Sequence, residues 1–303
     1  MLVKEPKILY LNPTGYSNLK NEYEDLQKNW KVNIMYFNKF VEAIDILNDR
    51  FHLKTAEFQE CFEWTLHPQI IEIIEYLKKE KFYLKGTTNG TVLNTELRKI
   101  IISSFEEIVI KLDTYDRTVY KEKKEKDYFP KVLSNLENLL EERDSASSKL
   151  KIGLEFGGIN NMEEFVQIIS FADRRRVDFV KINNEKMSNL HLQNKISMYL
   201  KNVWKMYLKR IDFLRPTGNY RTKECKFFPL FLVLVVNGDL LNCKRFYLSD
   251  KYSKHLLGNV ISGISRASLF KKMNCSSYCC GCEFFEYSKI LNEFEKDNTL
   301  YFI

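Results

Sequence analysis

The segment FYLKGTTNGTVLNTELRKIIISSFEEIVIKLD, residues 82–113, holds one strand–helix–strand unit and decides the fold. Phe82 to Thr87 has the composition of a strand and ends in the turn residues Thr88-Asn89-Gly90. Leu93 to Ser103 carries apolar residues at helical spacing, and Ile108 to Leu112 is a second apolar strand. Two strands joined by a helix of this length run parallel in one sheet.

The same alternation continues in both directions, from residue 7 to about residue 183. Further strands are expected at Ile8–Leu11, Thr55–Phe58, Leu150–Phe156 and Val177–Ile182. Further helices are expected at Phe40–Leu47, Pro68–Lys81, Phe129–Glu142 and Met162–Ala172. Six strands that alternate with helices predict an α/β fold with a parallel sheet, open or curled.

In parallel α/β folds, ligands bind where the strands end at their carboxyl sides. This rule directs attention to Asn12–Glu24, Gln59–Glu63, Thr87–Gly90, Lys111–Asp113, Glu155–Asn160 and Lys181–Asn184. Within these ranges we expect a polar pocket lined by Glu63, Asn89, Lys111 and Asp113. The alternative is that these four side chains serve the fold alone.

The second notable segment is rich in cysteine. Six of the seven cysteines fall between residues 225 and 282, namely Cys225, Cys243, Cys275, Cys279, Cys280 and Cys282. A strand and turn, Phe231 to Val236 followed by Asn237-Gly238-Asp239, separate the first two. Thiols gathered in this way favour a metal site over disulfides in a protein without a secretion signal. Four thiolates suit either zinc or an iron–sulfur cluster.

Composition narrows the class of protein. The 303 residues carry 47 basic and 40 acidic side chains, a net charge of +7, and both signs are interspersed, so no nucleic-acid partner is expected. Lys121 to Asp127 is such a mixture, and we expect a solvated face or loop there. No apolar run reaches the roughly 20 residues of a membrane span. The first residues lack the apolar core of a signal peptide, which predicts a cytoplasmic protein.

Several motifs resemble the radical SAM (S-adenosylmethionine) superfamily. They are Thr88-Asn89-Gly90 after the third strand, Ile110-Lys111-Leu112-Asp113 at the end of the fourth, and Leu66-His67-Pro68 before the second helix. The cysteine-rich tail resembles the family's SPASM/twitch extension. The resemblance implies a partial (β/α)6 TIM-like barrel over residues 1–190, a helix and basic linker over 191–224, and a small iron–sulfur domain over 225–303.

The tail resemblance also implies ligands. Cys225, Cys243 after a Gly-x4 spacing, a Leu-Gly-Asn segment and a final C-x2-C are similar to a twitch domain with one auxiliary [4Fe–4S] cluster. By this analogy the ligands are Cys225, Cys243, Cys279 and Cys282, with Cys275 and Cys280 as alternates. Zinc remains the alternative metal.

At two of the family's motifs this sequence has different residues. Its cluster loop after the first strand reads T-x-x-C-N-L-x-C-x-x-C, and here Ser17, Asn21 and Glu24 stand at the three cysteine positions. A hydroxyl, an amide and a carboxylate do not replace three thiolates on an iron–sulfur cluster. The family's glycine pair falls at Cys61-Phe62-Glu63-Trp64, where only the glutamate matches. Cleavage of SAM is therefore not expected, and whether SAM binds stays open.

The resemblance and these departures together predict a radical SAM pseudoenzyme. Such a protein would bind a ribosomally made peptide, or pair with an active radical SAM enzyme and present the substrate to it. The alternative is an enzyme, either with a catalytic cluster on Cys275, Cys279 and Cys282, spaced C-x3-C-x2-C, or with non-radical acid–base chemistry at Glu63, Lys111 and Asp113.

Overall fold

In the computed structural model of the protein, the described residues are 7–20, 33–59, 62–157, 159–182, 231–241 and 256–263. Along the first of these stretches the elements are β1 (Ile8–Asn12), α2 (Phe37–Phe51), β2 (Thr55–Phe58), the 3-10 helix η1 (Trp64–Leu66), α3 (Ile70–Lys79), β3 (Tyr83–Thr88), α4 (Thr95–Ser104) and β4 (Phe105–Asp113). They continue with α5 (Arg117–Lys124), α6 (Phe129–Ser145), β5 (Lys151–Phe156), α7 (Met162–Arg174), β6 (Phe179–Ile182), β7 (Phe231–Val235), β8 (Asp239–Leu241) and β9 (Leu256–Asn259).

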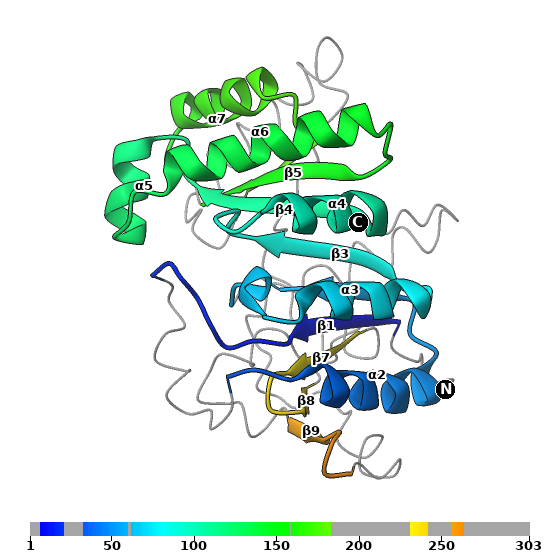
Figure 1. Ribbon diagram of the computed structural model, residues 1–303. Coiled ribbons are helices and arrows are strands. Elements are labelled where there is room, and N and C mark those ends of the chain that lie inside the picture. Colours follow the sequence, from blue (N-terminus) through cyan, green and yellow to red (C-terminus); the bar gives the residue numbers. More distant parts are fainter. Residues whose placement is uncertain are drawn as a thin grey trace, which may run out of the picture.

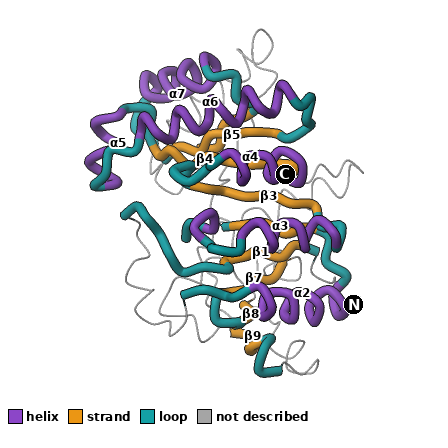
Figure 2. The backbone as a smooth tube through the Cα atoms, in the orientation of Figure 1, coloured by secondary structure: helices purple, strands orange, loops and turns teal. Residues whose placement is uncertain are grey.

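The strands form a single sheet in the order β6-β5-β4-β3-β2-β1-β7-β8-β9. Strands β1 to β6 are parallel neighbours in sequence order, and β7 joins the free edge of β1 in parallel register. Strands β8 and β9 then add antiparallel pairs. In Figures 1 and 2, α2, α3, α4 and α6 lie over the same face of the sheet. The predicted parallel α/β sheet is confirmed.

Helices α4, α5 and α7 begin where a short polar side chain accepts a hydrogen bond from one of the first backbone N–H groups. Asn94 accepts from the N–H of Leu97 at 2.8 Å at the start of α4. Asn161 does the same for Glu164 at the start of α7, also at 2.8 Å. Pro130 occupies the first turn of α6, where its missing N–H costs nothing.

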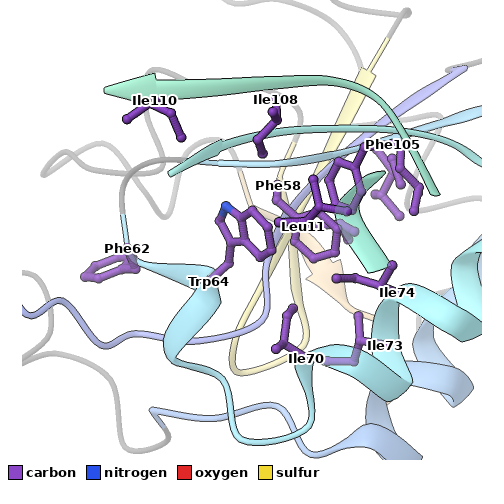
Figure 3. Packing of buried hydrophobic residues seen from close by; sticks show 14 of the residues in the cluster. Leu11, Phe58, Phe62, Trp64, Ile70, Ile73, Ile74, Phe105, Ile108 and Ile110 are labelled. Carbon is purple, nitrogen blue, oxygen red and sulfur yellow. The ribbon is translucent and has the colours of Figure 1, made fainter. Parts of the chain in front are cut away.

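The core lies between the sheet and these helices (Figure 3). Leu11 and Phe58 from the strands are buried against Ile73 and Ile74 of α3. The Trp64 ring stacks on that of Phe105, with centroids 5.8 Å apart and planes inclined by 16°. A Cβ at Gly86 would lie 3.1 Å from the Phe105 side chain and 3.2 Å from that of Trp64, so a glycine at this position of β3 leaves room for the two rings.

Helix α5 overlaps the segment Lys121 to Asp127, where the sequence predicts a solvated face or loop. Lys121 to Lys123 are exposed, so the solvated face is confirmed, but the helix itself was not predicted. The helix runs to Lys124, and Tyr120 is its single buried residue. Since only one residue is buried in its two turns, the sequence of this helix shows no apolar stripe at helical spacing. No helix within the described ranges is long and apolar enough to cross a membrane.

Candidate functional site

The loops that follow β1, β2 and β3 meet at one edge of the sheet, and Glu63 lies at their centre. Its backbone N–H donates to the carbonyl of Tyr16 at 2.8 Å, which joins the first two loops. The Glu63 side chain is only 4% exposed. A carboxylate buried to this degree requires hydrogen-bond donors around it.

Those donors are present. Carboxylate oxygen Oε1 of Glu63 accepts from the hydroxyls of Thr65 and Thr88, each at 2.6 Å, and Oε2 accepts from the backbone N–H of Asn89 at 2.7 Å. Burial raises the pKa of Glu63, and these hydrogen bonds oppose that shift. Both oxygens are thus occupied by the protein's own groups.

Asn89 extends this network to the loop after β1. Its side-chain amide donates to Oδ1 of Asn18 at 2.9 Å, and its own Oδ1 accepts from the hydroxyl of Thr91 at 2.6 Å. The Asn18 amide donates in turn to the Thr91 hydroxyl at 2.8 Å. The three side chains close a ring of hydrogen bonds that fixes the loop after β1 against the turn after β3.

Ser17 lies in the same loop, at the first of the three positions where the resembled family has cysteine. Its hydroxyl donates to the carbonyl of Leu19 at 2.8 Å, and the Leu19 N–H lies 3.4 Å from the same oxygen. This local turn uses the hydroxyl within the loop itself.

Lys111 and Asp113 lie on β4 at the same edge of the sheet, but they do not join Glu63 and Asn89. The Lys111 ammonium is 4.0 Å from the carboxylate of Glu155 on β5. Asp113 pairs with Lys124 of α5 and has a backbone φ of 64°, a left-handed conformation that re-aims the chain after the strand. The four predicted side chains thus form two separate groups.

The face of the sheet opposite the helices is charged. Lys85, Glu107 and Lys181 alternate with buried apolar residues along β3, β4 and β6, so they project from the other face. The Glu107 carboxylate lies 2.7 Å from Lys181 and 3.8 Å from Lys85. With the Lys111 and Glu155 pair, these residues make a half-buried ladder of alternating charge across the sheet.

Two buried amides at the ends of β1 and β2 have no hydrogen-bond partner. Asn12 is 2% exposed and Gln59 is 3% exposed. Neither polar atom of the Asn12 side chain, nor Oε1 of Gln59, has a partner. The Gln59 N–H donates to the carbonyl of Leu11 at 3.1 Å, so the two strand ends are neighbours. Unsatisfied buried amides are rare and often mark positions where a ligand binds.

Tyr120 connects the two groups of predicted residues and was not found from the sequence. Its side chain is fully buried, and its hydroxyl has no hydrogen-bond partner. Burial raises the pKa of Tyr120, and the charges of Asp113 and Glu63 raise it further. Its only sequence signal is one aromatic residue in the charged segment of α5.

His67, in the segment that resembles the family, has a structural role. Its ring is 2% exposed and accepts from the Gln69 N–H at Nδ1, at 3.0 Å. Nε2 therefore carries the proton and donates to the carbonyl of Met35, also at 3.0 Å. Burial lowers the pKa of His67.

The remaining predicted site residues lie outside the described residues. They are Asn21, Glu24, Cys225, Cys243, Cys275, Cys279, Cys280 and Cys282. Within the described ranges, no group of three His, Cys, Asp or Glu side chains is placed to hold a metal ion. The assignment of cluster ligands stays a prediction.

Comparison with solved structures supports the fold. Streptococcus suis SuiB bound to S-adenosylmethionine superposes with a TM-score of 0.68, at 13% identity, over 93% of this chain and 72% of that chain. SuiB bound to its precursor peptide SuiA gives the same score. AnSMEcpe with bound AdoMet gives 0.63, at 15% identity, over 93% of this chain and 87% of that one. The parallel α/β fold predicted from the sequence is thus shared with these solved structures.

Sequence comparison finds one short match. The tungsten-containing aldehyde ferredoxin oxidoreductase cofactor-modifying protein of Pyrococcus furiosus is 32% identical over 95 residues. The match spans 31% of this chain and 26% of that protein. No protein family model matches the sequence.

Proposed function

We propose that this chain is a radical SAM-like protein that does not cleave SAM and that binds a peptide substrate, either alone or for an active radical SAM partner. It would hold one auxiliary [4Fe–4S] cluster on Cys225, Cys243, Cys279 and Cys282. The observation that carries the proposal lies in the loop after β1. Of the three positions where the family has cluster cysteines, the structure describes the first, and Ser17 there has a hydroxyl in place of a thiol.

The donor set of that loop does not fit a catalytic cluster. Iron–sulfur clusters are held by thiolates, whereas Ser17, Asn21 and Glu24 offer a hydroxyl, an amide and a carboxylate. The Ser17 hydroxyl is already engaged by the backbone of Leu19. The ring formed by Asn18, Asn89 and Thr91 holds the loop in place with protein groups alone.

The environment of Glu63 supports the same conclusion. A ligand ammonium would have to reach a carboxylate that is only 4% exposed, and it would compete there with the hydroxyls of Thr65 and Thr88 and the N–H of Asn89. Each displaced donor is in a buried setting, where losing a hydrogen bond costs about 1–3 kcal/mol. Glu63 is thus suited to joining loops rather than to holding an ammonium ligand.

The peptide part of the proposal rests on the opposite face of the sheet. The Asn12 amide offers an unpartnered donor and an unpartnered acceptor, the pair of groups that a backbone peptide unit complements, and Oε1 of Gln59 adds a second acceptor. SuiB, which shares the fold, has been solved with its precursor peptide.

The test of the cluster assignment is anaerobic purification of the full chain, with iron, sulfide and zinc quantified and EPR recorded after reduction. About four irons and four sulfides per chain, with a signal that added SAM does not change, is the expected result. Zinc found without iron would mean that the cysteines hold a structural zinc ion and not an auxiliary cluster. A signal that shifts with SAM would contradict the proposal.

The catalytic part is tested by incubating the reconstituted protein with SAM and dithionite and measuring 5′-deoxyadenosine. No formation above the protein-free background is expected. Formation that is lost in Cys275→Ala would show instead a catalytic cluster in the tail and would overturn the pseudoenzyme proposal. The Ser17→Ala variant is the matched control. Because no catalytic cluster is expected at this loop, the substitution should not change the yield of 5′-deoxyadenosine.

Peptide binding is tested by selecting a displayed library of random twelve-residue peptides against the full chain. Enriched peptides are resynthesised and titrated by calorimetry, against both the wild type and Asn12→Leu. Binding with a Kd below about 100 µM, weakened about tenfold in the variant, is the expected result. Equal binding by the two proteins would reject the assignment of Asn12 to a peptide site.

A further inference from the structure

A pocket of about 620 Å³ lies where the start of α5, the body of α6 and the end of α7 meet. It is separate from Glu63, Asn89, Asn12 and Gln59, none of which lines it. Its wall combines aromatic rings with arginine and acidic side chains. Five of the eight residues that line it are charged, so the pocket suits a ligand that carries a charge.

Arg175 is the central polar group of this pocket. The carbon of its guanidinium lies 3.6 Å from the centroid of the Phe171 ring, a stacked cation–π arrangement. Nη1 donates to the Phe171 carbonyl at 3.2 Å, which closes the turn at the end of α7. These two contacts fix the plane of the guanidinium.

The other edge of the guanidinium has no hydrogen-bond partner among the described residues. Nε of Arg175 is buried and has no hydrogen-bond partner, and no described residue accepts from Nη2. The Nε and Nη2 hydrogens form the planar fork that matches the two oxygens of a carboxylate. Burial also lowers the pKa of Arg175, so the cation is held where an anion would stabilise it.

Two of the other charged side chains in the wall are engaged elsewhere. Arg117 is engaged by Asp127, with Nε and Nη2 each within 3.0 Å of Oδ2. Asp116 caps α5 by accepting from the Val119 N–H at 3.0 Å. On α6, Glu137 faces Arg175 and attracts its charge, while Arg174 on α7 repels it.

The apolar part of the wall defines the rest of the ligand. The rings of Phe129 and Phe171 lie 6.3 Å apart and are tilted by 49°. Tyr115 adds a third ring. Phe129 and Phe171 are only 7% and 5% exposed, so the half-buried Tyr115 is the ring of this wall against which a flat apolar group can stack.

We infer that this pocket binds a carboxylate attached to an apolar body, preferably an aromatic ring, with both carboxylate oxygens on the Nε and Nη2 edge of Arg175. A free aromatic acid and an acidic peptide end share this chemistry. Binding needs neither SAM nor an iron–sulfur cluster, so the inference stands apart from the proposed function.

The experiment is 19F NMR of the full chain with 4-fluorophenylacetate, using 4-fluorophenylacetamide as the matched neutral probe. The acid is expected to bind with a Kd in the millimolar range, and the amide at least about tenfold more weakly, because hydrogen bonds to charged groups are worth roughly that factor. A blocked dipeptide that ends in free phenylalanine then tests the peptide source of the carboxylate.

Variants assign the contact. Arg175→Lys keeps the charge but loses the fork, and it should weaken binding of the acid about tenfold. Arg176→Lys makes the same change in an adjacent exposed arginine that does not line the pocket, and it should leave binding unchanged. Glu137→Gln removes a negative charge from the wall and should tighten binding severalfold.

Three outcomes would overturn the inference. They are equal binding of the acid and the amide, undiminished binding by Arg175→Lys, or weaker binding of the acid by Glu137→Gln. Circular dichroism of each variant distinguishes a lost contact from a lost fold. The iron content and SAM assays of the proposed function do not enter into any of these results.

Discussion

The Glu63 carboxylate accepts a hydrogen bond from the backbone N–H of Asn89 at 2.7 Å, and this contact joins the loop after β2 to the turn after β3. The same carboxylate binds the hydroxyls of Thr65 and Thr88. A single acidic side chain therefore organises an edge of the sheet that in related folds is open to ligands.

Removing that side chain should destabilise the protein. Glu63→Ala leaves two hydroxyls and two N–H groups without an acceptor in a buried setting, and we expect a loss of about 2–4 kcal/mol in the free energy of unfolding. Chemical denaturation measures it. Glu106→Ala, at an exposed position of β4, is the control and should change stability by less than about 0.5 kcal/mol.

The raised pKa of Glu63 predicts a pH dependence with a definite sign. Between the ordinary value of 4.5 and the raised folded value, the folded state holds a proton that the unfolded state has lost. The wild type should therefore gain stability relative to Glu63→Gln as pH falls through this window. A difference between the two proteins that does not vary from pH 7 to 4.5 would contradict the raised pKa.

His67 should act in the opposite direction. Because burial lowers its folded pKa, the unfolded state takes up the proton first as pH falls below the ordinary value of 6.5. Stability should decline there relative to His67→Asn, whose amide oxygen replaces Nδ1 as acceptor for Gln69 but loses the bond to Met35. At pH 7 the variant should be less stable by about 1 kcal/mol.

The unpartnered amide of Asn12 predicts a stabilising substitution. Asn12→Leu replaces an unsatisfied buried amide with an apolar group of similar shape, and we expect a gain of about 1 kcal/mol or more. Asn18→Leu is the matched control, because its amide is bonded to Asn89 and Thr91, and it should lower stability. Thermal unfolding of both variants gives the comparison; a loss with Asn12→Leu would mean that the amide is satisfied in solution.

Gly153 on β5 should not tolerate a side chain. A Cβ there would lie 2.3 Å from the Phe179 ring of β6, its partner in the register. Gly153→Ala should cost about 1–3 kcal/mol through overpacking. Adding Phe179→Leu should recover part of the loss, and the absence of any recovery would mean that the glycine matters for another reason.

The cysteine assignment predicts a pattern of iron loss. Single Cys→Ser variants at residues 225, 243, 279 and 282 should each lose most of the iron of the anaerobically purified protein. The same change at Cys275 or Cys280 should retain it. Iron lost in the Cys275 variant but kept in the Cys279 variant would exchange these two residues in the ligand set.

Much of the fold was predictable because each strand between β1 and β6 is a short apolar run and each helix, except α5, has an apolar stripe. Helix α5 was missed because Tyr120 alone is buried in it. The place of β7 beside β1 was missed too, because local patterns do not encode the pairing of strands far apart in the chain.

The positions of four side chains at the strand ends were predicted, but their contacts were not. Strand ends marked Glu63, Asn89, Lys111 and Asp113, and all four lie at the carboxyl edge of the sheet. That Glu63 binds Asn89, while Asp113 binds Lys124, depends on loop conformations and on the unexpected helix. The sequence does not show that amide atoms of Asn12 and Gln59 lack hydrogen-bond partners, because the partners of a side chain are decided only in the folded chain.

The parallel pairing of Ile8 with Phe231 has a consequence for biosynthesis. Until the ribosome has made β7, one edge of β1 has no partner from within the sheet, and exposed edges recruit other chains. At about 5–20 residues per second, this interval lasts on the order of ten seconds or longer. The nascent chain should therefore depend on holding chaperones during that time, and slow translation of the segment before β7 should raise the fraction that aggregates.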